Sequence, residues 1–311
     1  MERIDKKKKK KKKVWPWIVG IIGVFVLAVV VYGILVFKGL TDTAKEIHEP
    51  IDRELSEKRE EPITFKKKEP FSVLVLGVDE REGDKGRSDT MIVLTVNPEL
   101  KSTKMVSIPR DTYTEMVGKG VQDKINHAYA FGGIEMSMAS VEGLLDIPID
   151  YVAQVNMESF KDIVDAVGGI HVTNPLDFKV GTNTFPKGEI TLDGEEALSF
   201  VRMRYEDPRG DFGRQDRQKQ VIQAVMREGA SLNSLVNFKS IFSAIGNNVR
   251  TNMTFDEMTD VQSKYRDAFG KVDQLYIKEG LGKTMNGVWY YMMNEKELEG
   301  IKVELKEHLK L

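Results

Sequence analysis

Residues 71–78 (FSVLVLGV) and 90–96 (TMIVLTV) are two short, almost uninterrupted apolar segments, and 103–108 (TKMVSI) is a third strand-like segment. Segments of this length that are rich in Val, Ile and Leu predict β-strands. The sequence between the second and third segments, 97–99 (NPE), is typical of a turn. Because the first two segments are apolar at almost every position, we expect a sheet with both faces covered.

Alternating helix and strand patterns follow on the C-terminal side. Residues 133–145 predict a helix, 151–156 a strand, and 157–167 a second helix, with a further strand at 170–173. This alternation predicts an α/β fold, namely a three-layer α/β/α domain with a central mixed sheet. Further helices are expected at 212–229, 231–246, 255–268 and 294–309 and after an N-cap at Asp193, and short strands at 273–277 and 288–291 are expected to extend the same sheet.

An uncharged segment precedes this domain at 14–37 (VWPWIVGIIGVFVLAVVVYGILVF). It would form about 36 Å of helix against a hydrocarbon core of about 30 Å, which predicts one transmembrane helix. The unbroken Lys run at 6–13 is expected to keep the tail at 1–13 in the cytoplasm, so the domain would lie outside the cell, as in a single-pass type II membrane protein. A cleaved signal peptide is the alternative, but its apolar region would be only about 7 to 15 residues long.

Charge composition separates a stalk from the folded domain in the rest of the chain. Of the 28 residues at 42–69, 16 are charged, so 38–69 is expected to form an extracytoplasmic stalk, with the folded domain at 70–311. Residues 39–311 hold 36 Lys and Arg against 46 Asp and Glu, a formal charge of −10, which argues against nucleic acid as a partner. The chain has no cysteine, which excludes disulfides, a thiolate nucleophile and Cys-ligated metal.

A polar loop joins the first two predicted strands and places a carboxylate at each strand end, Asp79 and Asp89. Two such carboxylates can hold a hard divalent cation such as Mg²⁺ (or Mn²⁺), which takes one or two protein carboxylates together with water and phosphate oxygens. The alternative is a solvated hairpin loop.

Arginines follow at two further places. The third predicted strand ends in Pro109-Arg110-Asp111, which on its own is typical of a turn with a surface ion pair. Five of the 14 arginines of the chain then fall within sixteen residues: Arg202, Arg204, Arg209, Arg214 and Arg217. Arginine forks match phosphate oxygens, and the last two, with Gln218, would share the first turns of a helix, where anions are favoured. A diphosphate ligand is therefore indicated, and a salt-bridge network with Asp207, Asp211 and Asp216 is the alternative.

Together these motifs resemble the LytR-CpsA-Psr family, in its wall teichoic acid ligase branch. The resemblance covers the predicted anchor and about 71–230, and it rests on LGVDEREGDKGRSDT (76–90), SIPRDT (107–112), KINHAYAFGG (124–133), VGGI (167–170), LDGEEAL (192–198) and R-x-R followed by DFGRQDRQ (211–218). It implies an enzyme that transfers a phosphate-linked anionic glycopolymer from undecaprenyl diphosphate to the C6 hydroxyl of peptidoglycan N-acetylmuramic acid.

The resemblance also implies roles for residues. The metal-binding carboxylates fall on Asp79 and Asp89, and the diphosphate-binding positions fall on Arg110, Arg202, Arg204, Arg214 and Gln218, while Arg87 and Arg217 are expected to support them. The implied reaction is a phosphoryl transfer governed by positioning and charge stabilisation. A lipid-diphosphate hydrolase and a membrane-anchored regulatory or binding protein remain the alternatives.

Overall fold

A six-stranded mixed sheet forms the centre of the molecule, in the strand order β11-β6-β1-β2-β3-β12. The computed structural model describes residues 48, 51, 56–78, 86–229 and 249–311. The sheet consists of β1 (Phe71–Val78), β2 (Ser88–Asn97), β3 (Ser102–Ser107), β6 (Tyr151–Val155), β11 (Val249–Thr251) and β12 (Val272–Leu275). β2 is antiparallel to both β1 and β3, whereas β6 is parallel to β1 and β12 is parallel to β3. The edge strand β11 is antiparallel to β6. The α/β prediction with a central mixed sheet is therefore confirmed.

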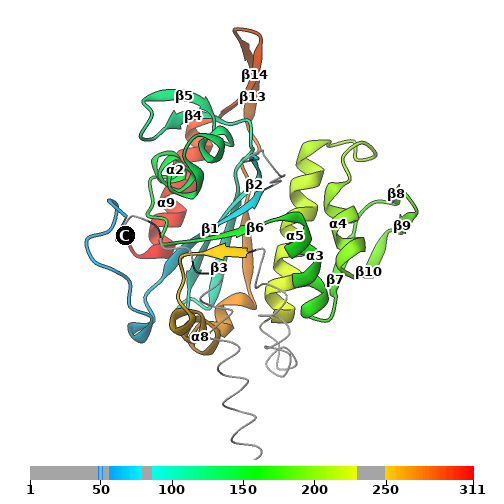
Figure 1. The fold of residues 1–311 in the computed structure, drawn as a ribbon, viewed down its shortest axis with the longest axis horizontal. Coiled ribbons are helices and arrows are strands. Elements are labelled where there is room, and N and C mark those ends of the chain that lie inside the picture. The colour runs from blue at the N-terminus through cyan, green and yellow to red at the C-terminus, as the bar shows by residue number, and fades with distance from the viewer. Residues whose placement is uncertain (1–47, 49–50, 52–55, 79–85, 230–248) are drawn as a thin grey trace, which may run out of the picture.

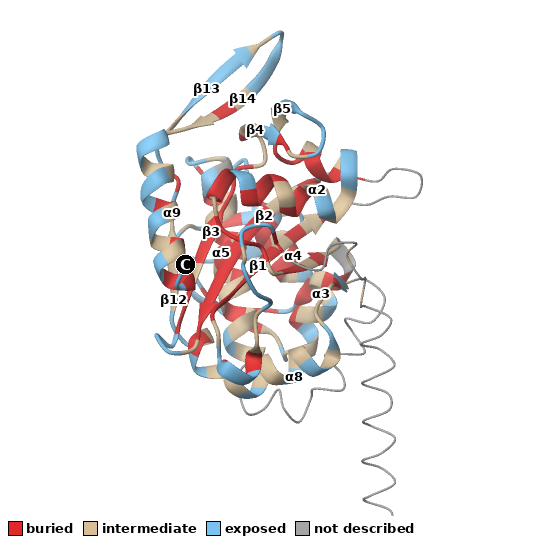
Figure 2. Cartoon of the chain, turned by 90° about the vertical axis from the view of Figure 1, so that its left-hand side faces the viewer, coloured by how far each residue is buried: buried red, intermediate tan, exposed pale blue. Residues whose placement is uncertain are grey.

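Helices cover both faces of this sheet (Figure 1). On one face, α2 (His127–Leu145) and α9 (Glu295–Leu309) pack against alternate strand residues such as Leu74 and Leu76. On the other face, α5 (Asp211–Gly229) packs Ile222 and Met226 against β2 and β3. The strands lie buried between these layers (Figure 2), which explains why they are almost uninterrupted apolar segments.

Smaller elements surround the three layers. They are α3 (Met157–Ala166), α4 (Gly194–Arg202), α8 (Phe255–Lys264), the 3-10 helices η1 (Phe65–Lys67) and η2 (Arg266–Phe269), and the two-stranded pairs β4 (Tyr113–Met116) with β5 (Val121–Lys124), β7 (Ile170–Asn174) with β10 (Gly188–Leu192), β8 (Phe178–Val180) with β9 (Asn183–Phe185), and β13 (Gly280–Met285) with β14 (Val288–Met293). The expected N-cap at Asp193 is confirmed. The Asp193 carboxylate accepts a hydrogen bond from the backbone N–H of Glu196, and the Glu196 carboxylate accepts one from the backbone N–H of Asp193.

The strand expected at 288–291 does not extend the central sheet, and that part of the prediction is wrong. It lies in β14, which pairs with β13 in a hairpin that projects from the domain (Figure 1). The hairpin turns at Asn286 and Gly287, both with positive φ, which is the two-residue turn that best matches strand twist. The local Asn-Gly turn thus determined the pairing of this strand.

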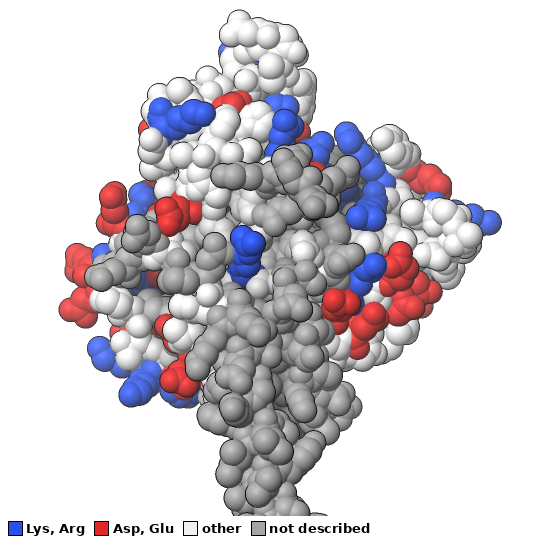
Figure 3. All heavy atoms as spheres, viewed as in Figure 1, with Lys and Arg blue, Asp and Glu red and all other residues white. Residues whose placement is uncertain are grey.

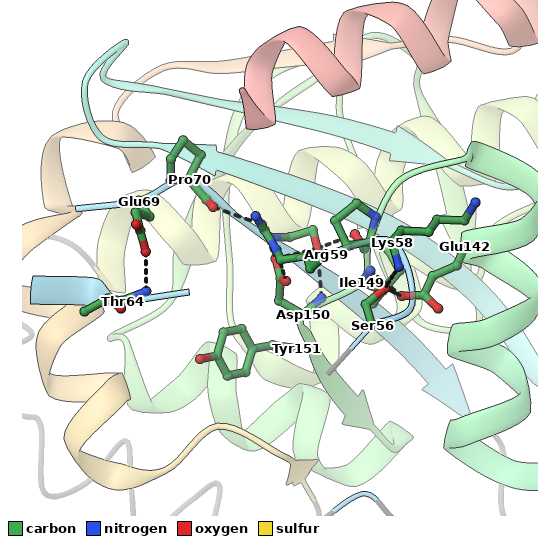
Figure 4. Close-up of polar contacts among 12 residues, drawn as sticks. Ser56, Lys58, Arg59, Thr64, Glu69, Pro70, Glu142, Ile149, Asp150 and Tyr151 are labelled. Carbon is green, nitrogen blue, oxygen red and sulfur yellow. Dashed lines mark hydrogen bonds and ion pairs between the residues drawn. The ribbon is translucent and has the colours of Figure 1, made fainter. Parts of the chain in front are cut away.

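The folded domain starts earlier than Phe71, because 56–69 packs against it. Arg59 forms two hydrogen bonds with Asp150, of 2.6 and 2.8 Å, and Ser56 donates to buried Glu142 at 2.5 Å (Figure 4). Phe65 is buried among Phe71 and other aromatic rings. Phe65 and Arg59 therefore attach this charged segment to the domain, which its charge composition did not reveal.

Several expectations lie outside the described residues: the cytoplasmic tail at 1–13, the transmembrane helix at 14–37, most of the stalk before residue 56, the helix at 231–246 and Asp79 with the loop residues that follow it. Within the part of the chain that the structure describes, no helix has both the length and the apolar character needed to cross a membrane.

Candidate functional site

Asp89 and Arg110 meet at one end of the central sheet. The pairing of β2 with β3 places Ile92 opposite Ser107, so the same register, continued by three residues, places Asp89 opposite Arg110. Arg110 Nη1 donates to Asp89 Oδ1 at 2.9 Å, and both side chains are partly exposed. Strand register therefore brings together two residues that are 21 positions apart in the sequence.

The turn that carries Arg110 is held by its neighbours. Thr112 donates to the carbonyl of Pro109 through both its hydroxyl, at 2.6 Å, and its backbone N–H, at 3.0 Å. Asn126, at the start of α2, donates its backbone N–H to the carbonyl of Arg110 at 3.2 Å. Lys124 binds Asp111 at 2.7 Å. The start of the KINHAYAFGG segment therefore positions the turn that carries the arginine.

The structure describes one of the two predicted metal ligands. The side chain of Asp89 is 38% exposed, so a carboxylate oxygen at the strand end can reach a cation. Arg87 is exposed immediately before β2, whereas Asp79 lies outside the described residues. Among the described residues, no three His, Asp or Glu side chains converge as a metal cluster would require. The chemistry of this edge fits a cation that takes most of its ligands from water and phosphate, as Mg²⁺ does.

The chain leaves the helix between Arg202 and Arg204, two side chains that would diverge on a regular helix. Arg202 is the last residue of α4, and Met203 has an extended backbone with φ −60° and ψ 130°. Met203 is buried, and the arginines on either side of it are exposed. Because residues i and i+2 of an extended segment point to the same side, both arginines can face one ligand. Figure 3 shows Lys and Arg side chains gathered over this part of the molecule.

Arg217 does not face a ligand at the helix start together with Arg214 and Gln218, because its side chain points inward. It is 1% exposed, its Nη1 binds Asp207 Oδ2 at 2.7 Å, and its Nη2 donates to the carbonyl of Met203 at 2.6 Å. Burial raises the pKa of Asp207, but hydrogen bonds from Arg217 and Arg209 lower this pKa to about 2. Arg217 therefore supports the extended Arg202–Arg204 segment and does not contact a ligand at the surface.

The two interpretations of the arginine cluster thus apply to different members. Arg209 and Arg217 form the salt-bridge network with Asp207 and Asp216. Arg214 is half-buried and lies one helical turn before Gln218 on α5, so these two side chains share a face. The spacing of the arginines alone could not separate these roles. Which arginine pairs with a carboxylate and which faces solvent depends on the residues that pack beside it in the folded domain.

The start of α5 lies beside the strand end that carries Arg110. Ser107, the last residue of β3, is 3.3 Å from Gln215, and Gln215 is the neighbour of Arg214. The sequence did not reveal this contact, which joins the turn of Arg110 to the arginine-rich start of α5. Lys219, which is 3% exposed and binds Asp216 at 3.1 Å, was also missed; the Asp–Lys spacing of three on a helix was the available signal.

Comparisons with known proteins agree on one family. The sequence profile of the LytR_cpsA_psr family matches residues 34–307. The Bacillus subtilis protein named polyisoprenyl-teichoic acid–peptidoglycan teichoic acid transferase TagU is 51% identical over 308 residues, covering 99% of this chain and 98% of that protein. Its namesake from Bacillus licheniformis is 52% identical, with 99% coverage of both chains.

Solved structures give the same result. The crystal structure of B. subtilis TagU, at 51% identity, covers 78% of this chain and 97% of its own, with a TM-score of 0.63. A structure of TagT bound to LI-WTA is 32% identical, covers 85% of this chain and 100% of its own, and has a TM-score of 0.72.

Proposed function

This chain belongs to the LytR_cpsA_psr family, and from that premise we propose that it is a polyisoprenyl-teichoic acid–peptidoglycan teichoic acid transferase. The donor is a lipid-linked teichoic acid and the acceptor is peptidoglycan, as the names of the relatives state for those proteins. In chemical detail, the enzyme takes a phosphate-linked glycopolymer from undecaprenyl diphosphate and joins it to the C6 hydroxyl of N-acetylmuramic acid. The identity of about 50% over nearly the whole chain supports this assignment.

The donor diphosphate is held between the strand end and the start of α5. Arg110, Arg214 and Gln218 lie on these two neighbouring segments, and exposed Arg202 and Arg204 lie shortly before α5 in the chain. Guanidinium groups donate paired hydrogen bonds to phosphate oxygens, and free N–H groups at a helix start favour the same anion. These groups neutralise the charge that develops as the bond to the leaving lipid phosphate breaks.

Asp89 has two tasks in this proposal. Its ion pair with Arg110 orients the guanidinium toward the diphosphate, and its carboxylate, with Asp79, would hold Mg²⁺ or Mn²⁺. When bound, the cation would neutralise part of the diphosphate charge. The exposure of Asp89 at the strand end supports this role.

The reaction takes place outside the cytoplasm, where peptidoglycan lies. The predicted helix at 14–37 would anchor the chain in the cell membrane, and the domain that follows would meet a lipid-linked donor at the membrane surface.

One observation carries the proposal: strand register and α5 place Asp89, Arg110 and Arg214 on adjoining segments at one sheet end. The test uses full-length protein in detergent with a lipid-diphosphate glycan donor, Mg²⁺ and peptidoglycan oligomers. We expect glycopolymer linked to peptidoglycan, loss of product in Arg110→Ala, and normal product in the control Arg227→Lys, at the far end of α5. Free glycopolymer phosphate would instead indicate a hydrolase, and binding without turnover would indicate a binding protein.

A further inference from the structure

The β13–β14 hairpin carries an aromatic surface on one face. Gly280, Gly282, Trp289 and Tyr291 lie on this face because residues two apart on a strand point to the same side. A Cβ on Gly282 would come within 2.6 Å of Trp289 Nε1, and a Cβ on Gly280 within 2.3 Å of the Tyr291 ring. The two glycines therefore leave room for the two rings to lie across the hairpin. Trp289 is nevertheless 49% exposed, and the hairpin projects from the domain (Figure 2).

This surface continues to the candidate site. Tyr291 donates its backbone N–H to the carbonyl of Asp111 at 2.9 Å, so the hairpin begins beside the turn that holds Arg110. The Tyr291 ring also packs edge-on against Phe212, at the start of α5, with centroids 6.3 Å apart. Tyr291 is 6% exposed, and within the described residues its hydroxyl has no hydrogen-bond partner. A buried hydroxyl of this kind is a ready donor for a bound molecule.

A pocket of about 350 Å³ lies next along this path, between the start of α5 and the connection from β12 to β13. Its lining includes two half-exposed aromatic rings, Phe212 and Tyr276, and Ser107 at the end of β3. We call Tyr276, Phe212, Tyr291 and Trp289 the aromatic track. It leads from the pocket, past the strand end that carries Arg110, to the projecting hairpin.

The lining of the pocket carries more cations than carboxylates. Arg209, Lys219 and Lys278 line it, against one carboxylate, Asp216. Lys219 is buried, lies 3.9 Å from the centre of the Tyr276 ring, and has a pKa lowered by that burial. Arg209 and Lys219 share the carboxylate of Asp216, whereas Lys278 has no carboxylate partner in the lining. The lining therefore keeps a positive charge that favours an anionic ligand group.

We propose that the aromatic track binds the glycan strand of the peptidoglycan acceptor, and that the pocket cations bind a carboxylate of its peptide stem. This inference rests on the proposed transferase function. Sugar rings have apolar C–H faces that pack on aromatic rings, and hydroxyls that can accept from a group such as the Tyr291 hydroxyl. Each strand of the hairpin is about 20 Å long, which suits several consecutive sugars rather than one.

Two features favour the acceptor over the phosphate-rich donor polymer. The one charged hairpin side chain, Lys283, lies on the opposite face from Trp289, whereas a polyphosphate would need cations along its path. The track also begins beside β12, which packs against Ile222 and Met226 of α5, whereas α4, which ends at Arg202, packs against a different face of α5. In phosphoryl transfer, the attacking and leaving oxygens lie in line on opposite sides of phosphorus.

The binding test uses intrinsic fluorescence. Trp289 is the third of three tryptophans, and the others, Trp15 and Trp17, lie in the predicted anchor. In full-length Trp15→Phe, Trp17→Phe protein in detergent, a donor-free peptidoglycan oligosaccharide with peptide stems should quench or shift the emission in a saturable way. Poly(glycerol phosphate) should leave the emission unchanged. Absence of a change with peptidoglycan, or a saturable change with poly(glycerol phosphate), would overturn the proposal.

The kinetic test compares Trp289→Ala with Leu281→Ala, which removes a more exposed apolar side chain from the opposite hairpin face. Trp289→Ala should raise KM for a long peptidoglycan acceptor about tenfold and leave kcat and the donor KM unchanged. Leu281→Ala should leave all three unchanged. Lys278→Gln should raise KM only for acceptors whose stem carboxylates are free, and not for amidated ones.

The outcomes separate this proposal from the transferase assignment. If wild-type protein forms no linked product, the transferase function fails, while the fluorescence titration still tests the track. If wild-type protein is active but Trp289→Ala matches Leu281→Ala, or raises the donor KM instead, the acceptor track is refuted.

Discussion

Replacing Asp207 by Ala should destabilise the domain strongly, although Asp207 lies in a connection between two helices. Asp207 is 5% exposed and pairs with Arg217, which is 1% exposed. The substitution leaves a buried guanidinium without its carboxylate, and loss of one partner of a buried ion pair costs about 3 to 5 kcal/mol. It also removes the acceptor of the backbone N–H of Arg209, at 2.9 Å.

The pH dependence of this loss has a definite sign. Burial raises the pKa of Asp207, but its bonds to Arg217 and Arg209 lower this pKa to about 2, against an ordinary value of 3.8. A lowered carboxyl pKa stabilises the fold above the unfolded value, and this contribution is lost as the pH falls toward the folded value. About 2 to 3 kcal/mol of the difference between wild type and variant should therefore disappear between pH 5 and pH 2.

Urea unfolding in mild detergent, followed by circular dichroism at several pH values, measures both effects. The control is Asp260→Ala, which breaks a partly exposed pair with Lys264 one helical turn away and should cost only about 0.3 to 0.5 kcal/mol. A loss below about 1 kcal/mol for Asp207→Ala at pH 7, or a difference that widens on acidification, would refute the assignment of Arg217 to a structural network.

Three further predictions concern single residues. Arg214→Lys should weaken binding of a short-chain prenyl diphosphate by about 1 to 3 kcal/mol in calorimetry without lowering Tm, because the charge stays but the planar fork is lost; unchanged affinity would contradict diphosphate binding. Asp89→Ala should abolish transfer while changing the unfolding free energy by less than about 1 kcal/mol, since its pair with Arg110 is partly exposed; a large loss of stability would instead indicate a structural role. His308 is buried near the end of α9, and this burial, with a smaller effect of Lys104, lowers its pKa to about 4. The free energy of unfolding of wild type should therefore fall by about 3 kcal/mol as the pH drops from 6.5 to 4. His308→Gln should lack most of this loss in urea titrations, and an equal loss in both proteins would disprove that His308 causes it.

Local sequence patterns were sufficient for most of the fold. The boundaries of β1 were predicted at both ends, and β2, β3, β6, α5 and α9 were each predicted to within two residues. These elements are buried in or packed on the central sheet, so apolar periodicity and the turns between them carry the information. The pairing of β14 with β13 was missed although the sequence carried its signal, because Asn286-Gly287 between two short strands is typical of a two-residue hairpin turn.

The residue types of the candidate site could also be predicted from sequence, because carboxylates at strand ends and clustered arginines indicate a diphosphate and its cation. Their division into roles could not. Strand register placed Asp89 against Arg110, and burial turned Arg217 toward Asp207 while Arg202 and Arg204 stayed exposed. An arginine has the same charge whether it is buried in a salt bridge or exposed to a ligand. The sequence therefore determined which charged groups are present but not which of these two roles each one has. Only the tertiary contacts, through register, burial and the nearest opposite charge, decided which of them face a ligand.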